Sequence, residues 1–237
     1  MVLMNKKMEF LHDDKNLVFY YDNDYFKITT DNLFLANFVK IKSKDKLLVE
    51  FGSGLMAIPL LLSTRTNIKM IGIEKDNGAS KLSENTIKEN NLEDRIKVIN
   101  DDIKNLNKYF AINSIDIIVC NPPYFLLENE AVVSNKHYLK MSRHEGDMTI
   151  DLIANLSKIY LKDGGSLFLI QRVDRLFEIR DTLIKNNLAI KEIQFIYHDL
   201  EARGKLVLVE AKKNGKEHGL KVLNPIILEK KESDING

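Results

Sequence analysis

The stretch Lys46–Gly54, which reads KLLVEFGSG, decides the fold. Its apolar run is typical of a strand that is buried on both faces, and a helical stretch at 57–63 follows its glycines. A glycine turn between a strand and a helix lets the backbone approach a ligand closely, with N–H groups that point at the ligand. The stretch therefore predicts a strand–turn–helix unit with a ligand site at the end of the strand.

From this unit outward, short apolar runs alternate with helical stretches along the chain. Strands are predicted at residues 46–51, 69–74, 96–100, 114–120, 166–171, 189–197 and 205–212. Helices are predicted at residues 57–63, 77–90, 147–161 and 173–187. This order requires a mainly parallel sheet with helices on both faces. Only residues 199–204 separate the last two strands, so no crossover helix fits there and that pair must be antiparallel.

The two ends of the chain differ from this alternating centre. Residues 1–30 are rich in aromatic side chains, and LVFYYDNDYF has the spacing of short strands. Thr30–Asp31 then precedes a capped amphipathic helix. We assign 1–30 to an N-terminal extension that packs on the core and 31–237 to one domain. The tail 220–229, LKVLNPIILE, can add a strand only at an edge of the sheet, because Pro225 has no N–H to donate.

The composition excludes several classes of protein. With 44% hydrophobic and 29% charged residues, the 237-residue chain can build a sizeable core. No apolar run approaches the roughly 18 residues of a membrane span, and the first ten residues lack the apolar stretch of a secretory signal. The single cysteine excludes a disulfide framework and fits a reducing cytoplasm. A net charge of +1 excludes a strongly cationic nucleic-acid coat protein, but it allows a locally basic groove.

Acidic residues follow the next two predicted strands. Glu74 ends the second strand about 22 residues after the glycine turn, a spacing at which a carboxylate can accept both hydroxyls of a ribose. Asp101 and Asp102 follow the third strand. We assign Asp102 to the exocyclic amine of an adenine and expect Asp101 to be solvated; the alternative is that both cap a helix at 103–108. Together with the turn, these residues predict a site for a nucleoside cofactor.

The fourth predicted strand ends at Cys120 and runs directly into Asn121-Pro122-Pro123-Tyr124. An exocyclic amine is a poor nucleophile because its lone pair is delocalised into the ring. Two acceptors aimed at its hydrogens, Asn121 Oδ1 and the Pro122 carbonyl, favour a pyramidal nitrogen with a localised lone pair. Prolines hold that carbonyl rigidly because their φ is fixed, and Tyr124 offers a flat face on which a base can stack. The motif therefore predicts chemistry at an exocyclic amine.

These motifs resemble the class I S-adenosylmethionine-dependent methyltransferases that modify exocyclic amines. Flanking segments narrow the resemblance to the bacterial tRNA1(Val) adenine-37 N6-methyltransferases; they are TDNLFLA at 30–36, IPLLL at 58–62, SRHE at 142–145, RVDRL at 172–176 and NPII at 224–227. The resemblance covers about residues 25–230. It implies an α/β fold with a Rossmann-like, seven-stranded methyltransferase sheet that ends in an antiparallel hairpin.

The resemblance also implies a role for each motif residue. The cofactor-binding residues would be Glu50, Gly52, Ser53, Gly54, Glu74, Asp102, Ile103 and Asn121. The catalytic residues would be Asn121, Pro122, Pro123 and Tyr124. The implied cofactor is S-adenosylmethionine and the implied acceptor is adenine N6 at position 37 of a tRNA. No metal ion and no membrane are expected, and the oligomeric state is left open, with a monomer favoured.

Two departures and several alternatives accompany this interpretation. Met56 stands where the family usually has a third glycine, and Glu50 where Asp is usual. These departures leave open a non-catalytic, tRNA-binding homologue. The Asn-Pro-Pro-Tyr motif alone also leaves open guanine N2 in ribosomal RNA and glutamine N5 in a protein. The basic segments 131–144 and 203–231 favour an RNA acceptor, because lysines and arginines there could hold its phosphates.

Overall fold

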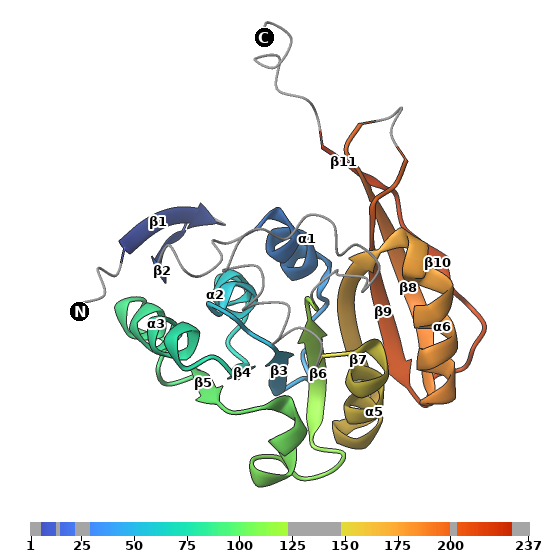
Figure 1. Cartoon of the computed structure of the whole chain (residues 1–237), viewed down its shortest axis with the longest axis horizontal. Coiled ribbons are helices and arrows are strands. Elements are labelled where there is room, and N and C mark those ends of the chain that lie inside the picture. The colour runs from blue at the N-terminus through green and yellow to red at the C-terminus, as the bar shows by residue number, and fades with distance from the viewer. Residues whose placement is uncertain (1–5, 13–14, 22–28, 123–147, 200–202, 229–237) are drawn as a thin grey trace, which may run out of the picture.

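A computed structural model describes residues 6–12, 15–21, 29–122, 148–199 and 203–228. One large sheet lies between two layers of helices (Figure 1). Its long strands are β3 (Leu47–Phe51), β4 (Lys69–Glu74), β5 (Ile96–Asn100), β6 (Ile115–Cys120), β7 (Leu161–Arg172), β8 (Leu188–Tyr197) and β9 (Leu206–Lys213). Their order across the sheet is β8-β9-β7-β6-β3-β4-β5. β3 to β7 are parallel, and β9 is antiparallel to both β7 and β8, which confirms the predicted sheet and its final hairpin.

The tail extends this sheet at one edge. Two short strands, β10 (Lys221–Val222) and β11 (Ile226–Ile227), both pair with β8. Pro225 lies between them, so it interrupts no continuous ladder. The expected edge strand is therefore present, in two pieces.

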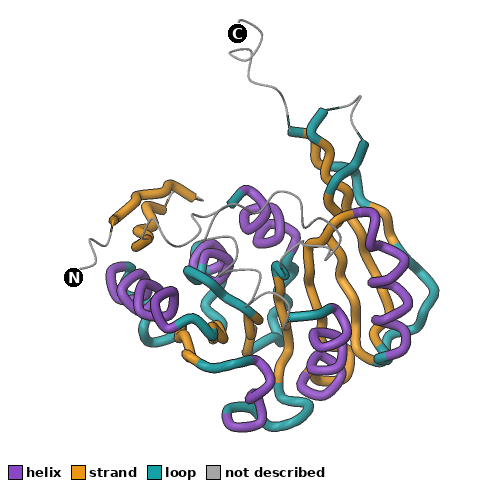
Figure 2. Tube along the Cα trace, viewed as in Figure 1, coloured by secondary structure: helices purple, strands orange, loops and turns teal. Residues whose placement is uncertain are grey.

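One helix precedes β3, and helices fill the connections between the strands from β3 to β8 (Figure 2). They are α1 (Thr30–Phe38), α2 (Ala57–Leu62), α3 (Asn77–Glu89), the 3-10 helix η1 (Ile103–Lys108), α5 (Ile150–Tyr160), the 3-10 turn η3 (Val173–Arg175) and α6 (Leu176–Lys185). Several boundaries differ from the predicted ones. The helix predicted at 147–161 is α5, which begins only at Ile150, and the one predicted at 173–187 is split into η3 and α6. The N-cap of α1 is Thr29, which makes no side-chain capping bond. β7 begins at Leu161, before the glycines at 164–165, because Leu161 already pairs with Ile115.

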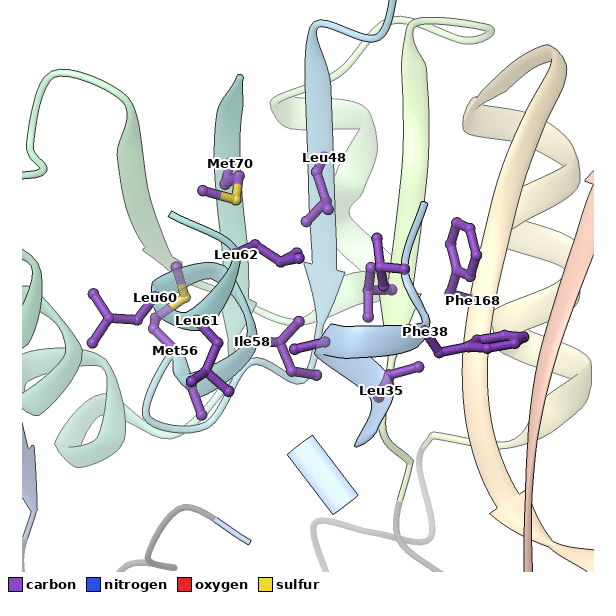
Figure 3. Packing of buried hydrophobic residues seen from close by; sticks show 14 of the residues in the cluster. Leu35, Phe38, Leu48, Met56, Ile58, Leu60, Leu61, Leu62, Met70 and Phe168 are labelled. Carbon is purple, nitrogen blue, oxygen red and sulfur yellow. The ribbon is translucent and has the colours of Figure 1, made fainter. Parts of the chain in front are cut away.

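Alternate residues of the buried strands build two separate cores, one on each face of the sheet. Leu48 packs with α1 and α2, whereas its neighbour Val49 packs with η1, α5 and α6. Phe168 of β7 belongs to the first core and meets Phe38 edge-on, with ring centroids 5.8 Å apart (Figure 3). This two-sided burial explains why the strands are nearly continuous apolar runs.

The N-terminal hairpin, β1 (Lys6–His12) and β2 (Lys15–Tyr21), lies against α3. The backbone N–H of Val18 donates to Asn90 Oδ1 at 3.0 Å, and that of Tyr20 donates to Thr86 Oγ1 at 2.9 Å. Side chains of α3 and of its C-cap Asn90 thus satisfy two backbone N–H groups of β2. In the described ranges, no helix is long and apolar enough to cross a membrane.

Candidate active site

The predicted site residues meet at the carboxyl edge of the parallel strands. Phe51 of β3 is in register with Cys120 of β6, so the glycine turn and Asn121 leave neighbouring strands at the same level. On the other side of β3, Glu74 ends β4 in register with Asn100 at the end of β5. With about 4.8 Å between adjacent strands, the edge presents, in order, the turn after β5, Glu74, the glycine turn and Asn121. Ligands of open α/β sheets bind at such an edge.

The glycine turn has the backbone conformation that its sequence predicts. Gly52 and Gly54 have φ angles of +65° and +52°, which disfavour side chains. A Cβ on Gly52 would lie 2.6 Å from Met148 Cε, whereas nothing lies within 4 Å of a Cβ position on Gly54. Among the described residues, nothing therefore approaches Gly54 at the edge, while Gly52 is packed against Met148, before α5.

Met56 turns away from that open space. It has a left-handed backbone (φ 59°, ψ 30°) and caps α2, and the residue is only 1% exposed. A Cβ on Gly72 of β4 would lie 2.0 Å from Met56 Sδ, so the missing side chain of Gly72 makes room for the methionine. The thioether packs within the core between α2 and the sheet (Figure 3). The third glycine position is thus bulky, but its bulk lies inside the protein.

Glu50 and Ser53 are buried polar residues on either side of Gly52. Glu50 Oε2 and Ser53 Oγ have no hydrogen-bond partner among the described residues. Burial raises the pKa of Glu50 well above its usual range, and the nearby Glu74 carboxylate raises it further. Buried polar groups are nearly always hydrogen-bonded in folded proteins. A carboxylate oxygen and a hydroxyl that have no partner among the described residues, beside the glycine turn, therefore favour a ligand that supplies hydrogen-bond donors, preferably with positive charge.

Glu74 faces the same turn but is satisfied by the backbone. Its Oε2 accepts from the N–H of Gly54 and its Oε1 from the N–H of Asp76, each at 2.7 Å. Burial raises its pKa, and these two hydrogen bonds lower it in part. Each carboxylate oxygen has a second lone pair. The side chain can therefore hold the turn in place and still accept hydroxyl groups of a ligand.

The turn after β5 is more ordered than we expected. Asp101 accepts from the Asp102 N–H, Asn105 Nδ2, Lys108 Nζ and Tyr109 Oη at 2.7–2.9 Å. Asp101 is half-buried, so it still meets solvent as expected, but the expectation missed these bonds, which form because η1 and its C-cap Tyr109 bring three donor side chains onto the carboxylate. These bonds hold the pKa of Asp101 far below its usual range.

Asp102 has the capping role that was the alternative to a ligand contact. It is the N-cap of η1, where its Oδ1 accepts from the Lys104 N–H at 2.9 Å, and its Oδ2 lies 3.2 Å from Lys75 Nζ. The following Ile103 is 5% exposed and packs into the core beneath the turn. The capping alternative is correct for Asp102, and it leaves lone pairs that could accept an exocyclic amine.

Asn121 follows β6 directly and is half-buried. Its Nδ2 donates to Asn32 Oδ1 of α1 at 2.8 Å, and the next residue, Pro122, is buried. The expected roles of Pro123 and Tyr124 fall outside the described residues, as does the basic segment 131–144. Cys120 is buried, with its Sγ 3.5 Å from the Phe51 carbonyl.

The residues present fit a nucleoside cofactor with a cationic end. Carboxylates lie at the ends of three adjacent strands, and Glu50, the one nearest Asn121, has an oxygen with no donor among the described residues. The described parts of the chain contain no group of three or more side chains suited to a metal ion.

Sequence reasoning missed three contacts that shape this edge. Asn100 Nδ2 donates to the carbonyls of Glu74 and Lys75, which ties the ends of β4 and β5 together. Met148 lies against Gly52, and its Sδ is 3.7 Å from Cys120 Sγ. Asn32 contacts Asn121 across 89 residues of sequence. Each joins segments far apart in the chain, so no local pattern could have indicated it.

The comparisons with known proteins agree with this geometry. Residues 26–192 match the model of the methyltransferase small domain family. A Tolumonas auensis protein named tRNA1(Val) (adenine(37)-N6)-methyltransferase is 26% identical over 149 residues, which are 62% of this chain and 60% of that protein. A Cytophaga hutchinsonii protein of the same name is 22% identical over 176 residues, 74% of this chain and 72% of that protein. The chain thus aligns with only about three fifths of the length of the first relative.

A solved structure also shares the fold. It is a T. thermophilus 16S rRNA N2 G1207 methyltransferase in complex with AdoMet and guanosine, with a TM-score of 0.62 and 17% sequence identity. The match covers 88% of this chain and 50% of that one.

Proposed function

This chain belongs to the methyltransferase small domain family, and we propose that it transfers a methyl group from S-adenosylmethionine to N6 of an adenine in a tRNA. The proposed adenine is at position 37, next to the anticodon on its 3′ side. A tRNA acceptor makes the cytoplasm the proposed place of the reaction.

One observation carries the proposal: Asn121 follows β6 at the level of the glycine turn on β3. We assign the adenine of the cofactor to the turn after β5, the ribose to Glu74 and the methionine part to Glu50 and Ser53. In this arrangement the reactive end of the cofactor faces Asn121, because the three carboxylates follow the order of the strands. The names of the curated relatives support an adenine acceptor in tRNA.

When bound, the cofactor supplies an electrophilic methyl group on a positively charged sulfur. Asn121 Oδ1 and the Pro122 carbonyl accept the two hydrogens of the adenine amine and so favour a pyramidal nitrogen. Both groups hold the amine in line for displacement, and positioning of this kind can supply much of the rate. The amine nitrogen becomes more acidic as it gains the methyl group, so the chain needs no strong base to remove its proton.

The acceptor can be tested with the purified chain, methyl-labelled S-adenosylmethionine and unmodified tRNA transcripts. Nucleoside analysis should find the label in N6-methyladenosine. The matched control is the same transcript with guanosine in place of adenosine-37, and it should remain unlabelled. Activity should fall as salt rises, because phosphate contacts weaken with ionic strength.

The same assay decides between this proposal and its alternatives. Duplex DNA, ribosomal RNA and a release factor are added in turn as competing acceptors. Label in guanine N2 of ribosomal RNA or in a protein glutamine would contradict the tRNA-adenine proposal. Tight binding of tRNA with no transfer to any acceptor would instead support a non-catalytic homologue.

A further inference from the structure

The amide of Asn121 is held by a residue on a different layer of the molecule. Its Nδ2 donates to Asn32 Oδ1 at 2.8 Å. Asn32 lies in the first turn of α1, and the contact spans the gap between that helix and the end of β6. An asparagine amide has its donor and its acceptor on opposite arms. A bond that fixes the nitrogen toward α1 therefore also fixes the direction of the oxygen.

The sequence places Asn32 on the buried face of α1. Residues three and four apart lie on one side of a helix, and Leu35 and Ala36, the residues at these spacings from Asn32, are 0% and 1% exposed. Asn32 continues that face by one turn, to the point where α1 passes over the carboxyl edge of the sheet. By contrast, Asn37 on the same helix is exposed.

α1 is firmly anchored, which a residue that orients another requires. Phe38 packs edge-on against Phe168 of β7. At the end of the helix, Arg65 Nη2 donates to the carbonyls of Ala36 and Val39. Asn32 is thus presented from a helix that is tied to the sheet through both apolar and polar contacts.

We propose that Asn32 is a positioning residue for methyl transfer, which fixes the Asn121 amide so that its oxygen faces the acceptor amine. This inference rests on the proposed function. Asn32 touches neither cofactor nor substrate in this account and acts through Asn121 alone. Its loss should therefore slow the transfer step without weakening the binding of either ligand.

The test compares full-length variants by single-turnover transfer to tRNA and by calorimetry with S-adenosylmethionine. Asn32→Ala should slow transfer about 10- to 100-fold, the penalty for a misplaced group in a catalytic site. Cofactor affinity and the KM for tRNA should stay within about twofold, as for a change that leaves binding contacts intact. Asn32→Asp should restore most of the rate, because its carboxylate oxygen accepts the same hydrogen bond. Asn37→Ala, the same substitution on the exposed face, should match the wild type.

A second background separates positioning from simple helix packing. Asn121→Asp keeps an acceptor oxygen and removes the amide donor, so the hydrogen bond that Asn32 Oδ1 accepts is lost; only a rotated Asn32 amide could donate to the new carboxylate. Adding Asn32→Ala to Asn121→Asp should change the rate by less than about twofold, the usual error of independent effects. A further loss as large as in the wild-type background would overturn the inference, since Asn32 would then act through some other contact. Equal losses in cofactor affinity and in rate for Asn32→Ala would overturn it too.

Side-chain amide resonances give a readout that does not require activity. The Asn121 carboxamide signal, identified by its loss in Asn121→Asp, should shift in Asn32→Ala and stay in place in Asn37→Ala. An unmoved signal in Asn32→Ala would overturn the inference even if the enzyme is active. If the wild type transfers no methyl group to any acceptor, the proposed function fails, and this signal alone then decides whether Asn32 orients the amide.

Discussion

The turns after β3 and after β5 lie at the same edge of the sheet, but they satisfy their polar atoms in opposite ways. After β5, Asp101 accepts four hydrogen bonds from residues that follow it closely in the chain. After β3, Glu50 Oε2 and Ser53 Oγ find no partner among the described residues, and Met56 has a left-handed backbone. Unsatisfied polar groups and backbone strain collect at functional sites. Asp101 in the β5 turn is therefore satisfied within the chain, whereas the β3 turn is the part that, on our proposal, the methionine end of the cofactor completes.

The comparison is tested most strongly by Glu50→Gln, which keeps the shape of the side chain and removes its charge. The affinity for S-adenosylmethionine should fall about 10- to 150-fold, because a hydrogen bond to a charged group contributes about 1.5–3 kcal/mol. The ligand-free variant should melt at the same temperature as the wild type or higher, since a buried carboxylate without a donor is removed. Calorimetry and thermal unfolding measure the two effects. Unchanged affinity would show that Glu50 does not serve the cofactor.

The packing beneath the β3 turn can be tested with Gly72→Ala. The added methyl group would meet Met56 Sδ at 2.0 Å and Ser53 Oγ at 2.5 Å, so the variant should unfold about 1–3 kcal/mol more easily, as overpacked cores do. Part of this loss should disappear in the Met56→Ala background, because the sulfur is then absent. Denaturant unfolding of the two single variants and the double variant gives the coupling energy. The same penalty in both backgrounds would mean that Met56 does not occupy the space above Gly72.

The contributions of Glu50 and Asp101 to folding stability should also change with pH in opposite directions. Burial raises the pKa of Glu50, so its contribution to stability is complete below its unfolded-state pKa of about 4.3 and is lost as pH rises through the folded-state value. Glu50→Gln should therefore match the wild type in acid and become the more stable of the two as pH rises.

For Asp101 the sign reverses. Hydrogen bonds from Tyr109, Asn105 and Lys108 lower its pKa, so its contribution is present above the unfolded-state value of about 3.9 and is lost as pH falls through the folded-state value. Asp101→Asn should melt below the wild type at neutral pH and approach it in acid. Melting temperatures of Glu50→Gln, Asp101→Asn and the wild type, measured across the pH range, test both expectations. If the difference in melting temperature from the wild type changed with pH in the same direction for both variants, the contrast between the two turns would be contradicted.

Much of the fold could be predicted because local patterns determined it. The apolar runs at 69–74 and 96–100 coincide with β4 and β5, since strands buried on both faces leave a continuous signal in the sequence. The antiparallel hairpin followed from the short loop alone. The early start of β7 could not be predicted, because it depends on pairing with Ile115 in a distant part of the chain.

The site could be predicted by residue type but not by side-chain direction. The predicted strand ends put Glu50, Glu74 and Asn121 at one edge of the sheet, and the structure has them there. The register of parallel strands determines which residues share an edge. The direction of Met56 could not be inferred, because Gly72, which makes room for it, lies on another strand. The order around Asp101 was missed because Tyr109 reaches back to it only once η1 has formed.

The most direct test of the central claim compares the wild type with Asn121→Ala in two assays on the same preparations. Calorimetry measures S-adenosylmethionine binding, and nucleoside analysis of a tRNA transcript measures transfer. The affinities should agree within a few fold while N6-methyladenosine forms only with the wild type, because the acceptor groups matter mainly as the amine becomes pyramidal. If Asn121→Ala formed N6-methyladenosine as well as the wild type, the claim that the Asn121 amide holds the acceptor amine during transfer would be contradicted.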